Sequence, residues 1–399
     1  MSRIPYLAQA LVGRSRWYDF AIGAWFILLA WIVSQLVFQT PLTAISTELG
    51  LDAMMADNTA AMLEQVEANA AQAALGGLMA LLGVVIGVVC YLIHRNTQGG
   101  VSRAMGILSG IGVAASLVGA GLLVPAMGGA SNEASSAWLG ALLSASPLAY
   151  ALLLLSFVGA FVGAWLVQRF VHGRTFLSLL TAARRYRWMR MVWVLLLTWG
   201  VYALTTFVFS SMGIGGEIYI NPERSRMLPF VVATLLFIPI QCAAEEIMFR
   251  GYFNQALGKY IPSALVVFAI TSIAFGAMHL ANPEIATAKE EGTFWLAFSS
   301  YVLFGFLLSV MVWIDNGLEA AIGVHIANNA WAATFINYEG SVLPIPGLFL
   351  SSPAPTDIVT GLVALGLVTL GVWMTRKPMG VGNDPLADPA YATPLSTAE

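Results

Sequence analysis

A set of ionisable and amide side chains that could do chemistry stands in the C-terminal half of this sequence, inside stretches that are otherwise apolar. They are Glu245, Glu246, Arg250, His279, His325, Asn328 and Asn329. A charged group within a membrane costs at least about 3 kcal/mol, so residues of this kind usually face a cavity and have a function. Carboxylate, imidazole and amide groups together can activate a water and stabilise an oxyanion, which are the two requirements of peptide hydrolysis.

Helical spacing separates the roles of the two adjacent glutamates. Glu246 and Arg250 stand at i and i+4, where an ion pair would keep both charged and fix the rotation of the helix. Glu245 projects about 100° away from Glu246 on a helix. Glu245 is therefore free to face a cavity as a general base.

The remaining groups follow the same spacing. Phe275 and His279 share one helix face, and His325 and Asn329 share another. Asn328 points away from the second face, which makes it the weakest candidate. Three helices could thus bring their polar residues to one pocket.

Depth in the membrane tests whether these groups can meet. If the helix that carries Glu245 continues to Gly258, Glu245 lies roughly 20 Å above the turn. His279 then lies roughly 25 Å above Pro262, at a similar depth. His325 is expected to be shallower, unless its helix starts deeper or tilts.

Three motifs on these segments resemble those of a known family. They are EEIMFR at 245–250, FGAMH at 275–279 and HIANN at 325–329. In order and spacing they resemble the CPBP intramembrane peptidases, which include the CAAX prenyl endopeptidases that act on Ras-type proteins and many bacterial Abi-type relatives. The resemblance covers about residues 228–337, and it includes Phe304-Gly305 and the turn Asp315-Asn316-Gly317.

The resemblance implies an intramembrane endopeptidase that cleaves a peptide or a membrane-associated protein. It also implies that Glu245 and His279 activate the water, while His325 and Asn329 face the oxyanion. The residues that it implies as supporting ones are Glu246, Arg250 and Phe275.

The cofactor is left open at this stage. His279, His325 and Glu245 could bind Zn²⁺ and leave one position for water, and the family is often described as metallopeptidases. A metal-free scheme with Glu245 as the base uses the same residues. Asn329 is a poor zinc ligand and a good oxyanion donor, which slightly favours the metal-free scheme.

Two other classes of function fit buried Glu and His residues. A proton-coupled transporter would bury them at mid-membrane, but it usually has two related halves with broken helices. A non-catalytic membrane scaffold of the same fold would tolerate loss of Glu245 or His279, and both residues are present.

The composition places the chain in a bilayer. It is 58% hydrophobic and 10% charged, with a mean hydropathy of +0.79, so it lacks the charged surface of a soluble protein. About 20 apolar residues span the hydrocarbon core. The pattern predicts an all-α transmembrane bundle of about ten spans, at 20–38, 72–93, 105–127, 140–167, 189–210, 228–257, 262–280, 294–314, 318–337 and 357–375.

The distribution of basic residues predicts the orientation. Most Lys and Arg residues fall on one side of a ten-span model, and only Arg224, Arg226 and Lys289 fall on the other. Both termini are therefore expected in the cytoplasm, with the chain in the inner membrane of a bacterium. The expected partners are the lipid bilayer and a peptide or membrane-protein substrate, without nucleic acid, and the oligomeric state is open.

Four regions follow from these patterns. Residues 1–168 hold four spans with no deep ionisable residue and no assigned role. Residues 169–190 form a basic linker, either an interfacial helix or a simple cytoplasmic connection, and His172 within it looks incidental. Residues 191–376 form the catalytic membrane domain. The Pro-containing tail 377–399 is expected to be disordered.

Overall fold

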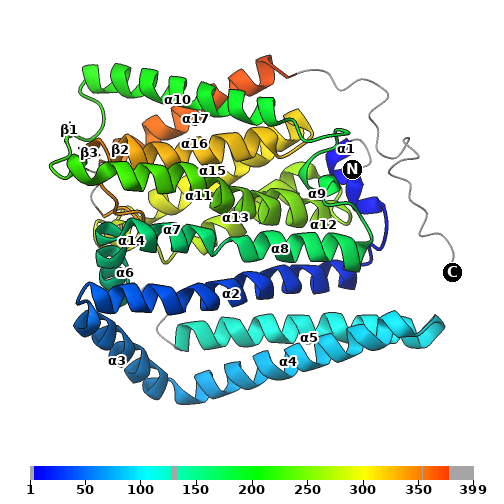
Figure 1. Cartoon of the computed structure of the whole chain (residues 1–399). Coiled ribbons are helices and arrows are strands. Elements are labelled where there is room, and N and C mark those ends of the chain that lie inside the picture. The colour runs from blue at the N-terminus through cyan, green and yellow to red at the C-terminus, as the bar shows by residue number, and fades with distance from the viewer. Residues whose placement is uncertain (1–3, 127–132, 339, 353, 377–399) are drawn as a thin grey trace.

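A computed structural model describes residues 4–126, 133–338, 340–352 and 354–376 of the chain. The tail 377–399, which the sequence predicts to be disordered, lies outside the described residues. The described part is mostly helical, and its long helices run side by side between the two ends of the bundle (Figure 1).

Eight helical segments in the described part are long and apolar enough to cross a membrane. Their bounds are α2 (Trp17–Glu48), α4 (Ala70–Asn96), α5 (Gly99–Ala126), α7 (Pro147–Leu155) with α8 (Val158–Leu166) and η2 (Val167–His172), α10 (Trp188–Ser211), η3 (Arg224–Arg226) with α11 (Met227–Glu246), η4 (Ile247–Phe253) and α12 (Asn254–Gly258), α15 (Phe294–Asp315) and α17 (Pro355–Met374). α13 (Ala264–Met278) and α14 (Pro283–Glu290) make a ninth if they are counted as one span, although they are bent by 89°. The chain is thus a multi-pass membrane protein with eight or nine candidate spans.

Of the ten predicted spans, 262–280 meets this criterion only as the bent pair of α13 and α14, and 318–337 does not meet it. The predicted span 318–337 forms α16 (Glu319–Thr334), which has 16 residues, and every residue from 319 to 327 is buried. α16 packs against α10, α11 and α15 in the interior of the bundle (Figure 1). Because its polar side chains find partners on these neighbours, α16 needs neither the length nor the apolarity of a lipid-facing helix.

A small sheet adds to the helices that the sequence predicts. Its strand order is β1-β3-β2, with β1 (Ile218–Ile220) antiparallel and β2 (Ile336–Tyr338) parallel to β3 (Phe349–Ser351). The sheet lies at the end of the bundle where α10 and α16 end (Figure 1). It ties the α10–α11 connection to the α16–α17 connection, so the all-α prediction is right for the bundle and misses this element.

Shorter helices complete the structure. They are α1 (Pro5–Ala8), η1 (Gln9–Leu11), α3 (Asp52–Ala68), α6 (Glu133–Ala145) and α9 (Leu177–Leu180). Within the basic linker 169–190, α9 is only four residues long, so the linker does not form the interfacial helix considered above. His172 is not incidental: it is fully buried, and its two ring nitrogens lie 2.7 Å from the Arg14 carbonyl oxygen and 2.8 Å from the Tyr252 hydroxyl.

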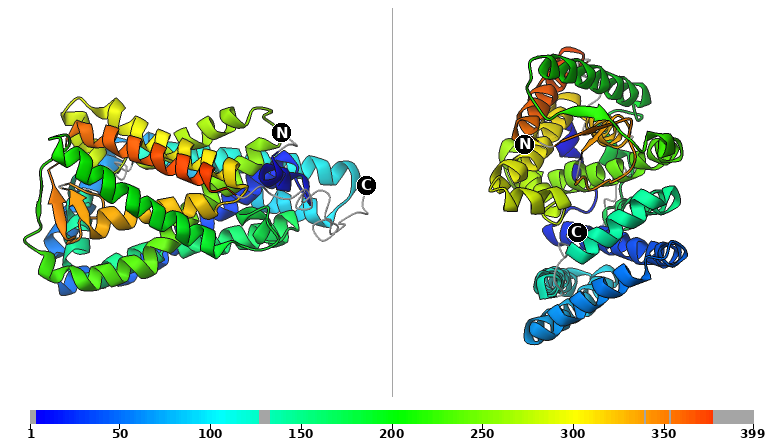
Figure 2. Two further views of the ribbon diagram at one scale, coloured as in Figure 1. Left: turned by 90° about the horizontal axis from the view of Figure 1, so that it is seen from above. Right: turned by 90° about the vertical axis from the view of Figure 1, so that its left-hand side faces the viewer.

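The hairpin of α4 and α5 lies at the edge of the bundle, next to α2 (Figure 2). Its helices approach closely through glycines, as the Gly-rich sequence predicts. A Cβ on Gly83 would collide with the backbone of Gly112 and Ser116, whereas a Cβ on Gly77 would meet no atom within 4 Å.

Gly83→Val is therefore expected to destabilise the protein by about 1 to 3 kcal/mol, because it forces the two backbones apart. Thermal unfolding of the purified protein in detergent would measure the change. Gly77→Val is the matched control on the same helix and should unfold near the wild-type temperature. Equal shifts for the two variants would contradict the close-packing explanation.

Candidate active site

The helix that carries the glutamates continues past them, as the depth argument requires. α11 ends at Glu246 and passes directly into η4, a π-helical segment, and then into α12, which ends at Gly258. A π-helical turn is rare and frequently marks a functional site, because it shifts the faces that the side chains occupy. Here it separates Glu246 from the following turns of the same span.

The ion pair expected from the i, i+4 spacing is present and is buried. Arg250 Nη1 lies 3.0 Å from Glu246 Oε1, and the two side chains are 1% and 0% exposed. The guanidinium lies over the Phe275 ring, 4.1 Å from its centroid. A Cβ on Gly305 would lie 2.7 Å from Arg250 Nη2, so a larger residue there would displace the guanidinium.

His325 lies between the two glutamates. Its Nδ1 is 2.7 Å from Glu246 Oε1, and its Nε2 is 3.7 Å from Glu245 Oε2. His325 therefore lies at the same depth as the glutamates and not at a shallower one. Its helix must start deeper or tilt, as the sequence analysis requires if His325 is to reach them. The short contact assigns a proton to Nδ1, which donates to Glu246, and leaves Nε2 facing Glu245.

A glutamine that the sequence analysis did not single out joins Glu245 to Asn329. Gln241 Nε2 donates to Glu245 Oε1, and Asn329 Nδ2 donates to Gln241 Oε1 at 3.1 Å. Behind Asn329, Asn328 donates to its Oδ1 at 3.1 Å and accepts from the Tyr202 hydroxyl at 2.9 Å. The signal for Gln241 was its position four residues before Glu245.

Glu245 is held by one oxygen and free at the other. Oε1 accepts from Gln241, whereas Oε2 is buried and has no hydrogen-bond partner in the part of the chain that the structure describes. A carboxylate oriented in this way can accept a proton from a water or a substrate group.

His279 and His325 both lie near the Phe275 ring, with ring centroids 4.5 and 6.1 Å from it. His279 Nδ1 is 2.8 Å from the Phe275 carbonyl oxygen, which leaves Nε2 as the ring nitrogen available to a substrate or water. The imidazole stacks on Tyr301, with centroids 4.4 Å apart and planes 22° apart, and it contacts the Phe275 ring at 4.5 Å. Glu245 and His325 are near enough to act on it electrostatically. No hydrogen bond joins His279 to either of them among the described residues.

The proposed zinc ligands do not converge in this arrangement. Within residues 4–126, 133–338, 340–352 and 354–376, no three His, Cys, Asp or Glu side chains gather as a metal-binding group. One nitrogen of His325 is engaged by Glu246 and one nitrogen of His279 by a backbone carbonyl, which are contacts that zinc-binding histidines also make and which leave each Nε2 free. What the donor set His279, His325 and Glu245 lacks, as placed, is the close grouping that a metal needs.

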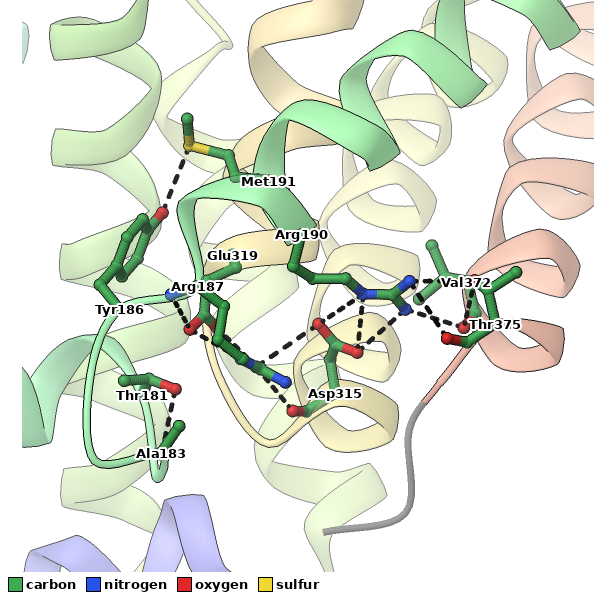
Figure 3. Close-up of polar contacts among 10 residues, drawn as sticks. All are labelled: Thr181, Ala183, Tyr186, Arg187, Arg190, Met191, Asp315, Glu319, Val372 and Thr375. Carbon is green, nitrogen blue, oxygen red and sulfur yellow. Dashed lines mark hydrogen bonds and ion pairs between the residues drawn. The ribbon is translucent and has the colours of Figure 1, made fainter.

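A second cluster of buried charges fixes the start of α16, which carries His325 (Figure 3). Arg187 Nη2 lies 2.7 Å from Glu319 Oε2, and the Glu319 side chain is fully buried. Arg190 Nη2 lies 3.0 Å from Asp315 Oδ1 and also donates to the Val372 carbonyl at 3.0 Å. These contacts join the N-terminal end of α10 and the residue before it to the α15–α16 turn and to the end of α17.

Comparisons with known proteins relate the segment that carries the three motifs to one family. Residues 225–331 match the family model of type II CAAX prenyl endopeptidase Rce1-like proteins. The chain is 29% identical over 230 residues to the uncharacterized protein YyaK of Bacillus subtilis (strain 168), which covers 55% of this chain and 73% of that protein. No solved structure matches the chain significantly. The family match contains every candidate site residue and leaves out the first four candidate spans.

Proposed function

We propose that this chain cleaves a peptide bond with a water that Glu245 activates. The premise is that residues 225–331 form an Rce1-like type II CAAX prenyl endopeptidase domain, of a family of peptide-bond hydrolases. The substrate is a peptide or a membrane-associated protein. The observation that carries the proposal is the state of Glu245: Gln241 holds Oε1, and Oε2 is buried without a partner among the described residues, opposite His325.

The first step is proton transfer from water to Glu245. Oε2 accepts the proton while the water oxygen forms a bond to the scissile carbonyl carbon. His279 Nε2 is an acceptor, because Nδ1 is engaged by the Phe275 carbonyl, and it orients the same water. The C–N bond then breaks, and the proton on Glu245 passes to the leaving amine.

The oxyanion faces His325 and Asn329. When both ring nitrogens of His325 carry protons, Nδ1 donates to Glu246 and Nε2 is free to donate to the oxyanion. The Asn329 amide has a second N–H besides the one that it gives to Gln241. Glu246, paired with Arg250, supports His325 and takes no part in the bond changes.

We also propose ten membrane passes, with both termini in the cytoplasm of a bacterial cell and the chain in its inner membrane. α16 is the tenth pass, since it lies antiparallel to α15 between the same two ends of the bundle, and α1 and the end of α17 lie at one end (Figure 1). That end carries the basic linker 169–190. On this topology residues 191–376 are the catalytic domain, and the described helices of residues 1–168 lie along one side of it (Figure 1).

The test compares protein N-termini in membranes that contain the wild-type chain, Glu245→Ala or Glu290→Ala at matched expression. Glu290 is exposed on α14, so its variant controls for the loss of an acidic residue. We expect new N-termini with the wild type and Glu290→Ala and their absence with Glu245→Ala. If all three samples share the same N-termini while the proteins are folded and abundant, a transporter or a non-catalytic scaffold becomes the better explanation.

A further inference from the structure

A polar cluster outside the three motifs lies beside His279. At its centre is Glu284, on the helix that follows the bend after α13. Its Oε1 accepts from the Tyr301 hydroxyl, from Asn282 Nδ2 at 3.2 Å and from the Tyr338 hydroxyl at 3.3 Å. Asn282 also donates to the Tyr301 hydroxyl at 3.1 Å. Three elements, α14, α15 and β2, thus meet at one carboxylate oxygen.

The 89° bend is what brings this carboxylate to α15. α13 ends at Met278, and α14 turns off at this bend. α14 packs against α15 through a small apolar core formed by Ile285, Ala288 and Ala297. Tyr301 packs against the same core. Burial and the Glu284 charge raise the pKa of Tyr338 above its usual value, so its hydroxyl remains a donor to Glu284.

Tyr301 links Glu284 to His279, because its hydroxyl donates to the carboxylate and its ring stacks on the imidazole. Its ring lies against one face of the imidazole at 4.4 Å, and the Phe275 ring lies 4.5 Å away. With Nδ1 fixed on the Phe275 carbonyl, the Tyr301 ring limits rotation of the imidazole plane. A freely rotating Tyr301 would give up this control, because its ring could leave the stacked position.

We infer that Glu284 is a positioning residue for peptide hydrolysis: by holding the Tyr301 hydroxyl, it fixes the plane of His279 and so the direction of Nε2. The inference rests on the proposed function, in which Nε2 orients the attacking water. Glu284 and Tyr301 lie outside all three motifs, and Glu284 acts on His279 through Tyr301.

The kinetic test uses a peptide reporter built on a cleavage site found by comparing N-termini, with the full-length protein in liposomes. Glu284→Ala is expected to lower kcat by about 10- to 100-fold with KM unchanged, because a small misplacement of a catalytic group costs about this much. Glu284→Gln keeps an acceptor oxygen and should restore most of the rate. Tyr338→Phe removes another bond to Glu284 without touching Tyr301, and it should retain most of the wild-type kcat.

A second measurement does not depend on activity. The rate at which diethyl pyrocarbonate modifies His279 reports how accessible its Nε2 is, and the fully buried His172 should stay unmodified as long as the protein is folded. Faster labelling of His279 in Glu284→Ala, together with the lower kcat, supports the inference. Unchanged labelling overturns it even if the wild type is an active peptidase. A wild type that cleaves nothing contradicts the proposed function instead.

Discussion

Glu245→Gln is expected to lower kcat for peptide hydrolysis by about 10³-fold and to leave KM nearly unchanged. General-base catalysis contributes about 10²- to 10⁴-fold, and a neutral amide accepts no proton from water under these conditions. Glutamine has the shape of glutamate and can still accept a hydrogen bond from Gln241, so the bundle should keep its fold. The loss therefore falls on the transition state rather than on substrate binding.

Single-turnover cleavage of the peptide reporter by the purified protein in liposomes would measure this effect. Glu290→Gln makes the same chemical change at an exposed position of α14 and should leave kcat unchanged. If Glu245→Gln unfolds at the wild-type temperature and its kcat lies within tenfold of the wild-type kcat, Glu245 is not the general base. His279 would then be the remaining acceptor close to the reacting water.

The local parts of this site could be predicted from sequence because they depend on helical spacing. The Glu246–Arg250 pair follows from i and i+4 on one helix, and the structure contains it. The same spacing could have found Gln241, four residues before Glu245. It was missed because an amide, unlike a charge, has a modest cost in an apolar helix and therefore attracts little notice.

The other contacts that escaped prediction join residues that are far apart in the chain. Glu284 meets Tyr338 across 54 positions, and Arg187 meets Glu319 across 132. No spacing rule connects such pairs, since their proximity depends on the bend after α13 and on the packing of α10 against α16.

Hydropathy also does not describe α16 well, because most of this helix contacts protein and not lipid. A hydropathy pattern predicts where lipid touches the chain, and α16 is a helix surrounded by protein. The burial of every residue from 319 to 327 explains why the predicted span 318–337 has Glu319 and His325 at positions where a lipid-facing helix would have apolar residues. The three-residue strands are also too short to show an alternating pattern.

Loss of the buried Arg250 side chain should lower the free energy of unfolding more than loss of an exposed arginine. Arg250→Ala is expected to destabilise the protein by about 3 to 5 kcal/mol, because it leaves the Glu246 carboxylate buried without its cation. Thermal unfolding in detergent would show this as a large fall in Tm. Arg226→Ala is the control: its pair with Glu223 is 48% and 60% exposed, so the expected loss is within about 1 kcal/mol.

A double variant separates the structural effect of the pair from its effect on the reaction. Glu246→Met with Arg250→Met removes both charges and keeps side chains of substantial volume, so it should recover much of the stability that Arg250→Ala loses. The double variant should nevertheless be inactive in peptide hydrolysis, because His325 Nδ1 loses the acceptor that orients the ring. If the double variant were as unstable as the single one, the lost packing on Phe275 rather than the uncompensated charge would explain the damage. If it were stable and active, Glu246 and Arg250 would only hold the helix in place, and His325 would keep its orientation without them.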